Sequence, residues 1–364
     1  MDMKTAIVIL NWNGREFLER FLPGLVASCT EDSEVIVADN ASTDGSMDML
    51  TERFPEVRTM VFSKNWGFTG GYNRALMQLD AEYFVLINSD IEVPDNWLSP
   101  LVQWMDSHPD CGICAPKLHS YDNKDMFEYA GAAGGYIDSM GYPFCRGRIM
   151  KMLQKDNGQY DIPAEVFWAT GACLMIRSSL YKALGGLDER FFAHMEEIDL
   201  CWRAQLEGWK IWIVPDSTVY HVGGGTLPNN SPWKLYLNFR NNLLMLENNL
   251  AKTLGLKLLR QGNDIRTSER MACKLAKRKI TLRMFLDGIS AAVYLITLRT
   301  DYFKAVIKAH KDYRRLVRKK ASDTEPVSKY LKRMRKKADI TGIWNGLIIP
   351  LALLRGKKAF NIFR

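Results

Sequence analysis

The sequence predicts an α/β fold built on a mostly parallel central sheet with helices on both faces. Within the first hundred residues, four apolar runs rich in β-branched residues alternate with stretches of helical periodicity. Repeated strand–helix units form parallel sheets that helices cover on both faces. Polar and glycine-rich residues follow the predicted strands, and ligands of such sheets bind beyond the carboxyl ends of the strands. We therefore expect a ligand site along that edge.

The elements are expected in a regular order up to about residue 100 and again after residue 165. We predict strands at 6–10, 34–38, 57–62 and 83–87, helices at about 15–26, 45–54 and 70–79, and a helix beginning near Pro94. Between residues 117 and 165, glycines, aromatic residues and the basic pair Arg146 and Arg148 indicate irregular hairpins or a substrate flap. Further on, we expect helices near 197–207 and 232–249 and strands near 210–214 and 218–221.

Charge divides the chain into an acidic body and a basic tail. The formal net charge is +8, but residues 1–250 hold 20 Lys and Arg against 33 Asp and Glu, whereas residues 251–364 hold 29 against 8. The tail is expected to be all-helical, and charged or polar residues interrupt its apolar stretches. Because a spanning helix needs about 20 mainly apolar residues, we expect basic amphipathic helices on a membrane surface. A solvated bundle or a protein interface stays open, and the apolar content argues against nucleic acid.

Composition and cysteine usage exclude several classes of protein. With 47% hydrophobic, 25% charged and 11% aromatic residues, the chain is not disordered, collagen-like or disulfide-dense. The mean hydropathy of −0.18 excludes a polytopic membrane protein. Seven scattered cysteines indicate buried thiols in a reducing compartment, and a lone Cys111/Cys114 pair is weak evidence for zinc. The apolar run near the N-terminus is shorter than that of a signal peptide, so we expect a cytoplasmic chain.

Three polar motifs follow predicted strands. Asp39 could accept a hydrogen bond from a uracil or thymine ring N–H, or its loop could cap the following helix. The glycine-rich segment 65–73 suits either a close backbone approach to a ligand or a tight turn. Asn88-Ser89-Asp90 leaves an apolar strand, and a carboxylate there fits a Mg²⁺ or Mn²⁺ site that also uses substrate phosphates. A helix cap is the alternative for Asp90.

Two further motifs lie near the end of the acidic body. At helical spacing, Glu196 shares a face with Asp199, which in turn faces Arg203, while Glu197 points elsewhere. That arrangement leaves one carboxylate free for chemistry and another held by an arginine, although acids at a helix start also complement the helix dipole. His221 leaves a predicted strand before three glycines, where it could reach a metal or a phosphate or have a structural role.

Taken in order, these motifs resemble family 2 glycosyltransferases of the GT-A fold, most closely the bacterial rhamnosyltransferase-like members that build surface polysaccharides. The resemblance covers roughly residues 3–250. The segments that carry it are 9–14, 39–46, 65–73, 88–90, 170–177, 185–192, 196–203 and 221–226. It implies a GT-A domain at 1–250, and the composition of residues 251–364 predicts a basic amphipathic helical region that associates with a membrane.

The resemblance also implies roles for individual residues. The nucleotide-sugar-binding set is Asn11, Asn13, Asp39, Asn65, Gly67, Asn73, Asn88, Ser89 and Gly171, with Asp39 reading the base. Asp90, the last acid of the DxD motif, and His221 are the implied metal ligands. Glu197 is the implied general base, and Glu196 and Asp199 complete the candidate catalytic carboxylates.

Three features differ from the family pattern. Asn88 replaces the first acid of the DxD motif, which leaves Asp90 to carry the metal. Glu197 is one methylene longer than the usual Asp, so Glu196 stays open as the base. The QxxRW motif of processive relatives is not evident, which indicates a single transfer.

The implied reaction moves one sugar, with inversion, from a nucleoside diphosphate donor to a hydroxyl of a glycan or lipid-linked acceptor. The cofactor is expected to be Mg²⁺ or Mn²⁺, and dTDP-rhamnose or a UDP-sugar is the favoured donor. We expect a protein peripheral to the inner face of the cytoplasmic membrane, bound through its C-terminal helices to anionic lipid, without nucleic acid; a homodimer stays open. The alternatives are a non-catalytic sugar-nucleotide-binding scaffold and a nucleotidyltransferase, although the 11–14 loop lacks the lysine that the latter would need.

Overall fold

A computed structural model describes the chain except for residues 1–2, 224–230, 321–324, 335–337 and 364. Its centre is a large sheet whose strands follow the order β11-β13-β6-β12-β4-β1-β2-β3, with β5 paired to β13. The strands are β1 (Thr5–Asn11), β2 (Ser33–Asp39), β3 (Arg58–Val61), β4 (Tyr83–Ile87), β5 (Ile91–Glu92), β6 (Cys111–Ser120), β11 (Ala164–Glu165), β12 (Cys173–Arg177) and β13 (Lys210–His221).

The large sheet is mostly parallel, as the sequence predicts. β1 pairs in parallel with β2 and β4, β2 with β3, and β6 with β13, whereas β12 runs antiparallel between β4 and β6. The predicted strands near 210–214 and 218–221 form one strand, β13, with a register shift between Ile213 and Thr218. Strand β6 was not predicted, and its register against β13 brings Ser120 beside His221.

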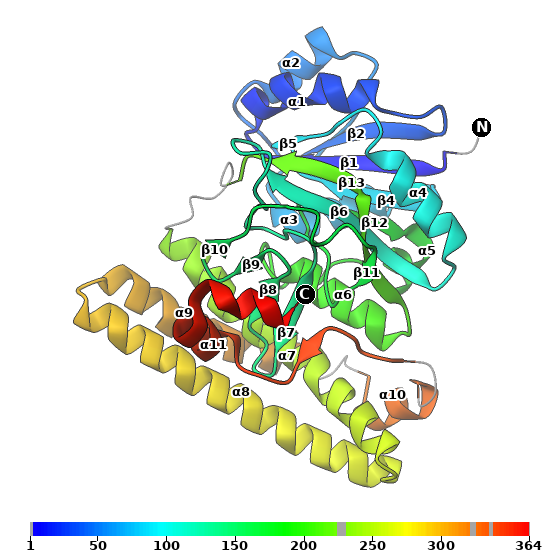
Figure 1. Cartoon of the computed structure of the whole chain (residues 1–364). Helices are drawn as coiled ribbons and strands as arrows, with labels where there is room; N and C mark the ends of the chain where they lie inside the picture. The colour runs from blue at the N-terminus through cyan, green and yellow to red at the C-terminus, as the bar shows by residue number, and fades with distance from the viewer. Residues whose placement is uncertain (1–2, 224–230, 321–324, 335–337, 364) are drawn as a thin grey trace.

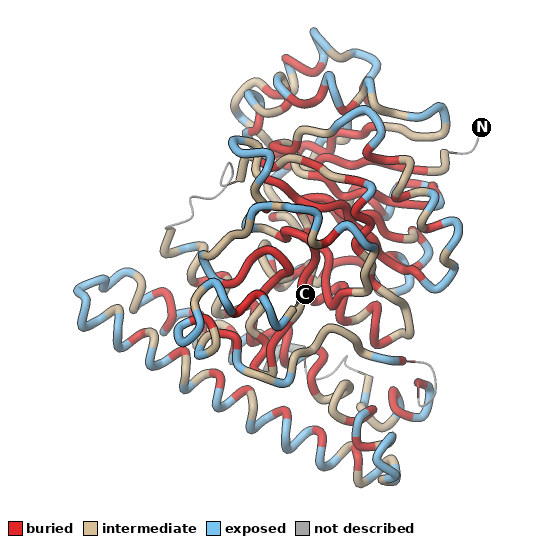
Figure 2. The backbone as a smooth tube through the Cα atoms, in the orientation of Figure 1, coloured by how far each residue is buried: buried red, intermediate tan, exposed pale blue. Residues whose placement is uncertain are grey.

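Helices cover both faces of this sheet because successive strand residues point to opposite faces. They are α1 (Arg15–Ala27), α2 (Ser46–Arg53), α3 (Gly67–Leu76), α4 (Leu98–Ser107), α5 (Ser178–Ala183) and α6 (Glu196–Leu206). In β1, Ala6 and Val8 belong to the core beneath α3 and α6, while Ile7 and Ile9 belong to the core beneath α1, α2 and α4. The two cores explain why the strands are apolar throughout, and Figure 2 shows the sheet buried along most of its length.

The segment expected to form irregular hairpins builds a second, small sheet. Its strands are β7 (Gly135–Asp138), β8 (Pro143–Cys145), β9 (Arg148–Ile149), β10 (Met152–Leu153) and β14 (Ile343–Trp344), in the order β10-β9-β8-β7-β14. β14 comes from the C-terminal region, so the expectation of an all-helical tail is wrong at this point. It pairs in parallel with β7, and Ile343 lies opposite Ile137.

The C-terminal helices form a layer below the large sheet (Figure 1). They are α7 (Pro232–Arg260), α8 (Ile265–Ile296), α9 (Thr300–Lys320), α10 (Val327–Met334) and α11 (Ile348–Arg355), followed by the 3₁₀ helix η1 (Gly356–Ile362). Because α7 packs on α6, α8 and α9 and runs unbroken through residue 250, the expected boundary between 250 and 251 falls inside a helix.

The charges that interrupt the apolar stretch of α8 pair with each other inside the layer. Arg283 Nε donates to Asp287 Oδ1 at 2.9 Å, and both side chains are buried. Arg283 Nη1 also donates to Asn242 Oδ1 on α7 at 2.5 Å. No helix among the described residues is both long enough and apolar enough to span a bilayer.

Candidate functional site

The carboxyl ends of β1 and β2 join the first two polar loops. Asn11 pairs with Asp39 in the strand register, and Asn11 Nδ2 donates to Asp39 Oδ1 at 2.9 Å. The backbone N–H of Ser42 donates to Asp39 Oδ2 at 3.0 Å. Asp39 is buried and caps no helix, because Gly45 is the N-cap of α2. Each Asp39 oxygen therefore accepts one hydrogen bond that holds the loop in place and has a second lone pair that can accept another.

The loop after Asn11 is held in an unusual backbone conformation. Asn13 has a φ of 53°, its N–H donates to Ser42 Oγ at 2.9 Å, and its Oδ1 accepts the N–H of Thr43 at 2.7 Å. These bonds fasten the 11–14 loop to the 39–44 loop, and Trp12 in the first loop is 42% exposed. The two loops act as one rigid rim at the edge of the sheet.

The glycine-rich segment supplies the next part of the rim. Asn65 Oδ1 accepts the N–H of Gly67 at 2.7 Å and Nδ2–H of Asn40 at 3.0 Å, which ties this loop to the end of β2. Gly67 has a φ of +73°, and a Cβ there would lie 2.4 Å from the ring of Phe192. Only glycine fits this contact without displacement of Phe192.

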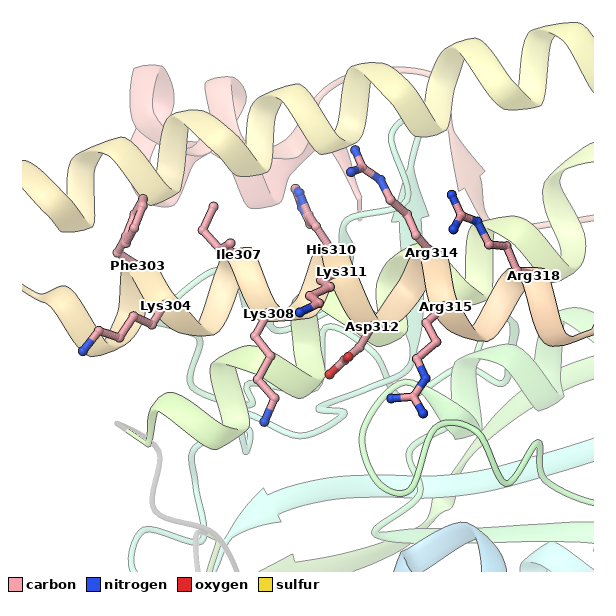
Figure 3. Close-up of a pocket in the computed structure, with 10 residues that line it drawn as sticks. All are labelled: Phe303, Lys304, Ile307, Lys308, His310, Lys311, Asp312, Arg314, Arg315 and Arg318. Atoms are coloured by element: carbon pink, nitrogen blue, oxygen red, sulfur yellow. The ribbon is translucent and has the colours of Figure 1, made fainter.

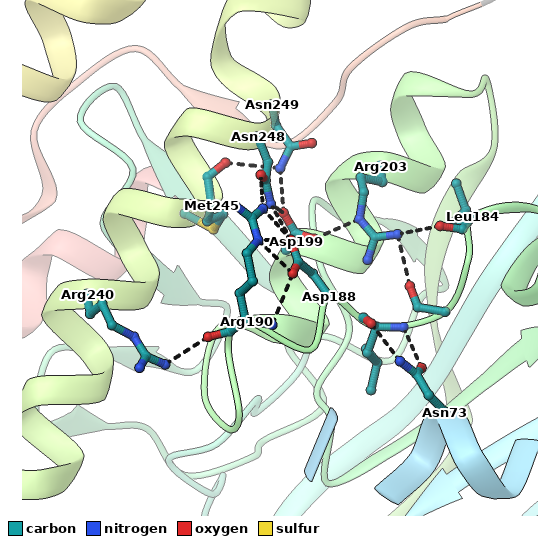
Figure 4. Close-up of polar contacts among 12 residues, drawn as sticks. Asn73, Leu184, Asp188, Arg190, Asp199, Arg203, Arg240, Met245, Asn248 and Asn249 are labelled. Carbon is teal, nitrogen blue, oxygen red and sulfur yellow. Dashed lines mark hydrogen bonds and ion pairs between the residues drawn. The ribbon is translucent and has the colours of Figure 1, made fainter. Parts of the chain in front are cut away.

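Asn73, predicted to bind the nucleotide, has a structural role instead. Its Nδ2 donates to Leu187 O at 2.8 Å and its Oδ1 accepts from the N–H of Leu187 at 2.8 Å, the two dashed lines at Asn73 in Figure 4. The same Oδ1 accepts from Tyr181 Oη at 2.7 Å. A Cβ on Gly186 would clash with Asn73 Oδ1 at 2.3 Å. The side chain therefore fastens α3 to the turn before Asp188, which a motif match alone does not reveal.

The predicted metal motif lies at the end of β4, next to the following strand pair. The N–H of Asn88 donates to Ala172 O at 2.9 Å, and Ser89 lies against Gly14 of the first loop. Asp90 is only 6% exposed, and its Oδ1 lies 3.2 Å from His221 Nε2. The structure thus brings Asp90 of the 88–90 motif beside His221, although the two residues are far apart in the sequence.

Glu128 is a member of this cluster that the sequence did not indicate. Its Oε2 lies 3.2 Å from His221 Nδ1, so the imidazole stands between two carboxylates. Glu128 belongs to the non-periodic segment 117–165, and no motif surrounds it. Only the pairing of β6 with β13, continued by the N–H of Tyr121 donating to His221 O, places this segment beside the histidine.

The electrostatics of this cluster follow from its geometry. Burial lowers the pKa of His221, but the adjacent carboxylates of Asp90 and Glu128 more than offset it and raise that pKa to about 10. Burial raises the pKa of Asp90, and the hydrogen bond and charge of His221 reverse the effect, so the pKa lies below its usual value. Without a bound cation, the cluster therefore holds one imidazolium between two carboxylates.

The cluster fits a divalent ion only together with a substrate. Among the described residues, no three His, Cys, Asp or Glu side chains are arranged to hold a metal by themselves. Mg²⁺ and Mn²⁺ accept one or two carboxylates and complete their coordination with substrate phosphates and water. Asp90, with His221 beside it, provides a donor set of that kind. Cys111 and Cys114 lie buried in β6, and within the described part of the chain no further His, Cys, Asp or Glu is grouped with them as a metal-ligand set.

The two glutamates that begin α6 carry raised pKa values. Burial raises the pKa of Glu197 to about 7, although hydrogen bonds from backbone N–H groups at the start of the helix lower it in part. Burial and the charge of Glu197 raise the pKa of Glu196 well above its usual value. Oε2 of Glu197 is buried without a hydrogen-bond partner among the described residues, and its Cβ lies 3.4 Å from where a Cβ on Gly171 would stand.

Gly171 connects Glu197 to the metal motif. The next residue, Ala172, accepts the N–H of Asn88, so the 170–172 turn lies between the start of α6 and the end of β4. Thr170 Oγ1 accepts the N–H of Ala172 at 3.1 Å and fixes this turn. Glu197 and the Asp90 cluster therefore line the same edge of the large sheet.

Asp199, the third candidate catalytic carboxylate, is fully engaged and serves the fold. It is completely buried, and its Oδ2 accepts Arg203 Nε at 2.7 Å, as the helical spacing predicts. Its Oδ1 accepts Asn248 Nδ2 and Asn249 Nδ2, each at 2.8 Å (Figure 4). Both amides come from α7, so Asp199 joins α6 to the C-terminal layer.

Comparison with known proteins agrees with this geometry. Residues 6–185 match the model of the family Glycosyl transferase family 2. The chain is 27% identical over 229 residues to the N-acetylglucosaminyl-diphospho-decaprenol L-rhamnosyltransferase of Mycobacterium tuberculosis (strain ATCC 25618 / H37Rv), covering 59% of this chain and 75% of that protein. It is 24% identical over 256 residues to the low-salt glycan biosynthesis hexosyltransferase Agl10 of Haloferax volcanii, covering 68% and 77%.

The fold itself has solved counterparts. The structure of GalNAc-T7 with UDP, GalNAc and Mn²⁺ superposes with a TM-score of 0.55 at 15% identity. That match covers 76% of this chain but only 54% of the longer GalNAc-T7 chain. From its matched family model, its relatives and its fold, the chain is a family 2 glycosyltransferase of the GT-A fold, similar to rhamnosyltransferases.

Proposed function

We propose that the protein transfers one sugar, with inversion, from a nucleoside diphosphate donor to a hydroxyl of a glycan or lipid-linked acceptor in cell-surface polysaccharide synthesis. The donor we assign is dTDP-rhamnose or a UDP-sugar, and the L-rhamnosyltransferase among the relatives supports rhamnose as the sugar. The observation that carries the proposal is Glu197, which has a pKa near 7 and a buried Oε2 without a hydrogen-bond partner among the described residues, on the same sheet edge as Asp90 and His221.

Glu197 is the proposed general base. Its free Oε2 accepts the proton of the acceptor hydroxyl while the acceptor oxygen forms a bond to the anomeric carbon of the donor sugar. The bond from that carbon to the diphosphate breaks in the same displacement, and the nucleoside diphosphate leaves with its electron pair. A base with a pKa near the working pH combines a large deprotonated fraction with useful basicity. Glu196 is the more buried of the two residues, and burial and the charge of Glu197 raise its pKa well above its usual value, so it suits this role less.

The donor-binding rim is assigned to the loops at the carboxyl edge. Asn11, Asn13, Asp39, Asn65 and Gly67 are placed on the nucleoside side, with one Asp39 lone pair available to a ring N–H. On the sugar and diphosphate side we assign Asn88, Ser89 and Gly171. A Mg²⁺ or Mn²⁺ ion held by Asp90 and His221 would neutralise charge on the departing diphosphate.

A donor-hydrolysis panel tests this function because hydrolysis needs no acceptor. The full chain is incubated with dTDP-, UDP- and GDP-sugars, each with Mn²⁺, with Mg²⁺ or with EDTA, and released nucleoside diphosphate is measured. We expect release from one nucleotide class, dependent on the divalent ion. Tight donor binding with neither hydrolysis nor transfer would instead support a sugar-nucleotide-binding scaffold.

The C-terminal layer is the proposed membrane-binding part. A groove of about 1140 Å³ runs along α9, and Figure 3 shows Phe303 and Ile307 directed toward α8 while Lys308 and Arg315 point away. The groove is lined by Lys304, Lys308, Lys311, Arg314, Arg315 and Arg318, with Asp312 the one acid in the lining. Each such cation near an anionic leaflet contributes up to about 1 kcal/mol.

The outer face of α8 adds apolar contacts to this charge. Leu282, Phe285, Ile289, Val293 and Ile296 recur at helical spacing and are 49–79% exposed. An exposed apolar stripe beside cations is the pattern of a helix that lies in a membrane interface. We propose that α8 and α9 hold the enzyme peripherally on the inner face of the cytoplasmic membrane, where lipid-linked acceptors are found.

A further inference from the structure

Two arginines of the small sheet are buried without an acidic partner. Arg146 and Arg148 are each 7% exposed, and no carboxylate in the described ranges lies within 4.0 Å of either guanidinium. Arg146 Nε donates to Ala133 O at 2.7 Å. Arg148 Nε is buried without any partner among the described residues.

Arg148 has favourable but weak contacts in place of an ion pair. Its Nη2 donates to Cys145 Sγ at 3.3 Å, and its Cζ lies 4.7 Å from the ring centroid of Tyr129. A thiol is a weak acceptor, and a single cation–π contact does not replace the hydration of a guanidinium. The charge of Glu128 acts on Arg148, but the described residues form no ion pair with the guanidinium, so it lacks a directly bonded anion.

The site borders the catalytic edge. Tyr129 is adjacent in sequence to Glu128, which lies against His221. Burial raises the pKa of Cys145, and so do the charges of Glu128 and Glu197, whereas Arg148 lowers it. The β8–β9 hairpin therefore lies within electrostatic reach of both the candidate base and the Asp90 cluster.

The same hairpin also connects to an exposed apolar surface. Phe144 of β8 and Ile149 of β9 pack in one core cluster with Ile348 of α11. Leu353 and Leu354 of α11 are 75% and 85% exposed. The β8–β9 hairpin and α11, which pack together, thus offer a buried cation and exposed leucines. These two features suit a ligand with a charged head and an apolar tail.

We propose that Arg148 binds a phosphate group of the acceptor, so that the acceptor is a sugar carried on a lipid phosphate or diphosphate. This inference rests on the proposed function, because it assigns the acceptor side of the same cleft. The guanidinium offers two parallel N–H donors to phosphate oxygens, a geometry that lysine cannot reproduce. The donor diphosphate is assigned elsewhere, at the end of β4.

The test uses geranyl diphosphate as the probe and inorganic pyrophosphate as its tail-less counterpart. Binding to the full chain is measured by calorimetry in EDTA, with and without saturating UDP or dTDP. We expect geranyl diphosphate to bind in the presence of nucleotide and Arg148→Gln to weaken it by about 10- to 100-fold, the loss of a charged hydrogen-bond pair. The affinity of Arg148→Lys for geranyl diphosphate should be intermediate. Arg58 is an exposed arginine on β3, and Arg58→Gln should bind the probe as tightly as the parent chain.

Each result supports or overturns the assignment. Unchanged binding in Arg148→Gln, or displacement of the probe by the nucleotide, would overturn it, the second because the arginine would then serve the donor. If Arg148→Gln does not fold, Arg148→Lys decides the question, and parental affinity in that variant counts against the proposal. Donor hydrolysis is measured on the parent chain and on Arg58→Gln, where it should be equal. Hydrolysis by the parent without probe binding would count against this site alone, and absence of hydrolysis would count against the proposed function.

Discussion

At the carboxyl edge of the large sheet the polar side chains are buried and hydrogen-bonded to one another, whereas on α8 and α9 the apolar side chains are exposed and cations outnumber acids. Asn11 and Asp39 are less than 2% exposed, while Phe285 is 66% exposed. A rigid set of buried polar groups is suited to a small ligand that needs a fixed geometry. A broad face of exposed cations and apolar groups is suited to a large, fluid partner.

The largest expected effect lies in the Asp90 cluster. Asp90→Ala removes the carboxylate assigned to the divalent ion, so transfer and donor hydrolysis should each fall by about 10³-fold or more. Added Mn²⁺ should not restore them. The matched control is Asp95→Ala, an exposed acid in the next loop, which should keep parental turnover. Near-normal hydrolysis by Asp90→Ala would make the metal assignment wrong.

The next effect concerns the base. Glu197→Gln removes the proton acceptor, and kcat should fall by about 10²–10⁴-fold. In the parent, kcat/KM should fall about tenfold per pH unit below about pH 7, because Glu197, whose pKa is about 7, becomes protonated there. The residual kcat/KM of Glu197→Gln should not show this decrease below about pH 7. If Glu196→Gln abolishes the decrease of kcat/KM at low pH and Glu197→Gln does not, Glu196 is the general base.

The third effect is on stability, and it separates Asp199 from its neighbours on α6. Asp199→Asn breaks a buried ion pair with Arg203 and weakens two bonds to α7, so the free energy of unfolding should fall by about 3–5 kcal/mol. The folded fraction should keep its kcat. Glu189→Gln, which breaks the more exposed pair with Arg74, should cost less than about 1 kcal/mol. If Asp199→Asn lost kcat but kept the stability of the parent, Asp199 would have a role in the reaction and not in the fold.

The smallest effect is on membrane binding. The double variant Phe285→Glu/Ile289→Glu places two charges in the apolar stripe and should weaken binding to anionic vesicles by about tenfold. Flotation of the full chain with anionic and with neutral vesicles measures this, and donor hydrolysis should be unchanged. Val61→Glu, on an exposed residue of β3, is the control. Equal flotation of all three proteins would show that α8 does not face the bilayer.

Much of the carboxyl edge of the large sheet could be predicted, because the strands and the loops that follow them depend on the pattern of neighbouring residues. Apolar runs fixed the four strands of the first hundred residues, and parallel pairing carries the residues after them to one edge. Asn11, Asp39, Asn88 and Asp90 therefore lie where the sequence places them. The Asp199–Arg203 pair also followed from helical spacing alone.

Other residues could not be assigned in this way. Asn73 lies within a matching motif, yet its amide is used by a turn more than a hundred residues away. Glu128 lies in a segment without periodicity and reaches His221 through the β6–β13 pairing. The partners of Asp199 on α7 are about fifty residues distant in sequence. Spacing along one helix or strand carries no information on such contacts.

The sequence by itself determined the alternation of strands and helices, the polar edge that follows from it and the basic character of the tail, because each is a local property of neighbouring residues. The tertiary structure decided which carboxylates are free, which are held by another element and which cations lack a partner. Those properties depend on burial and on contacts between distant segments, and only the folded chain brings the segments together.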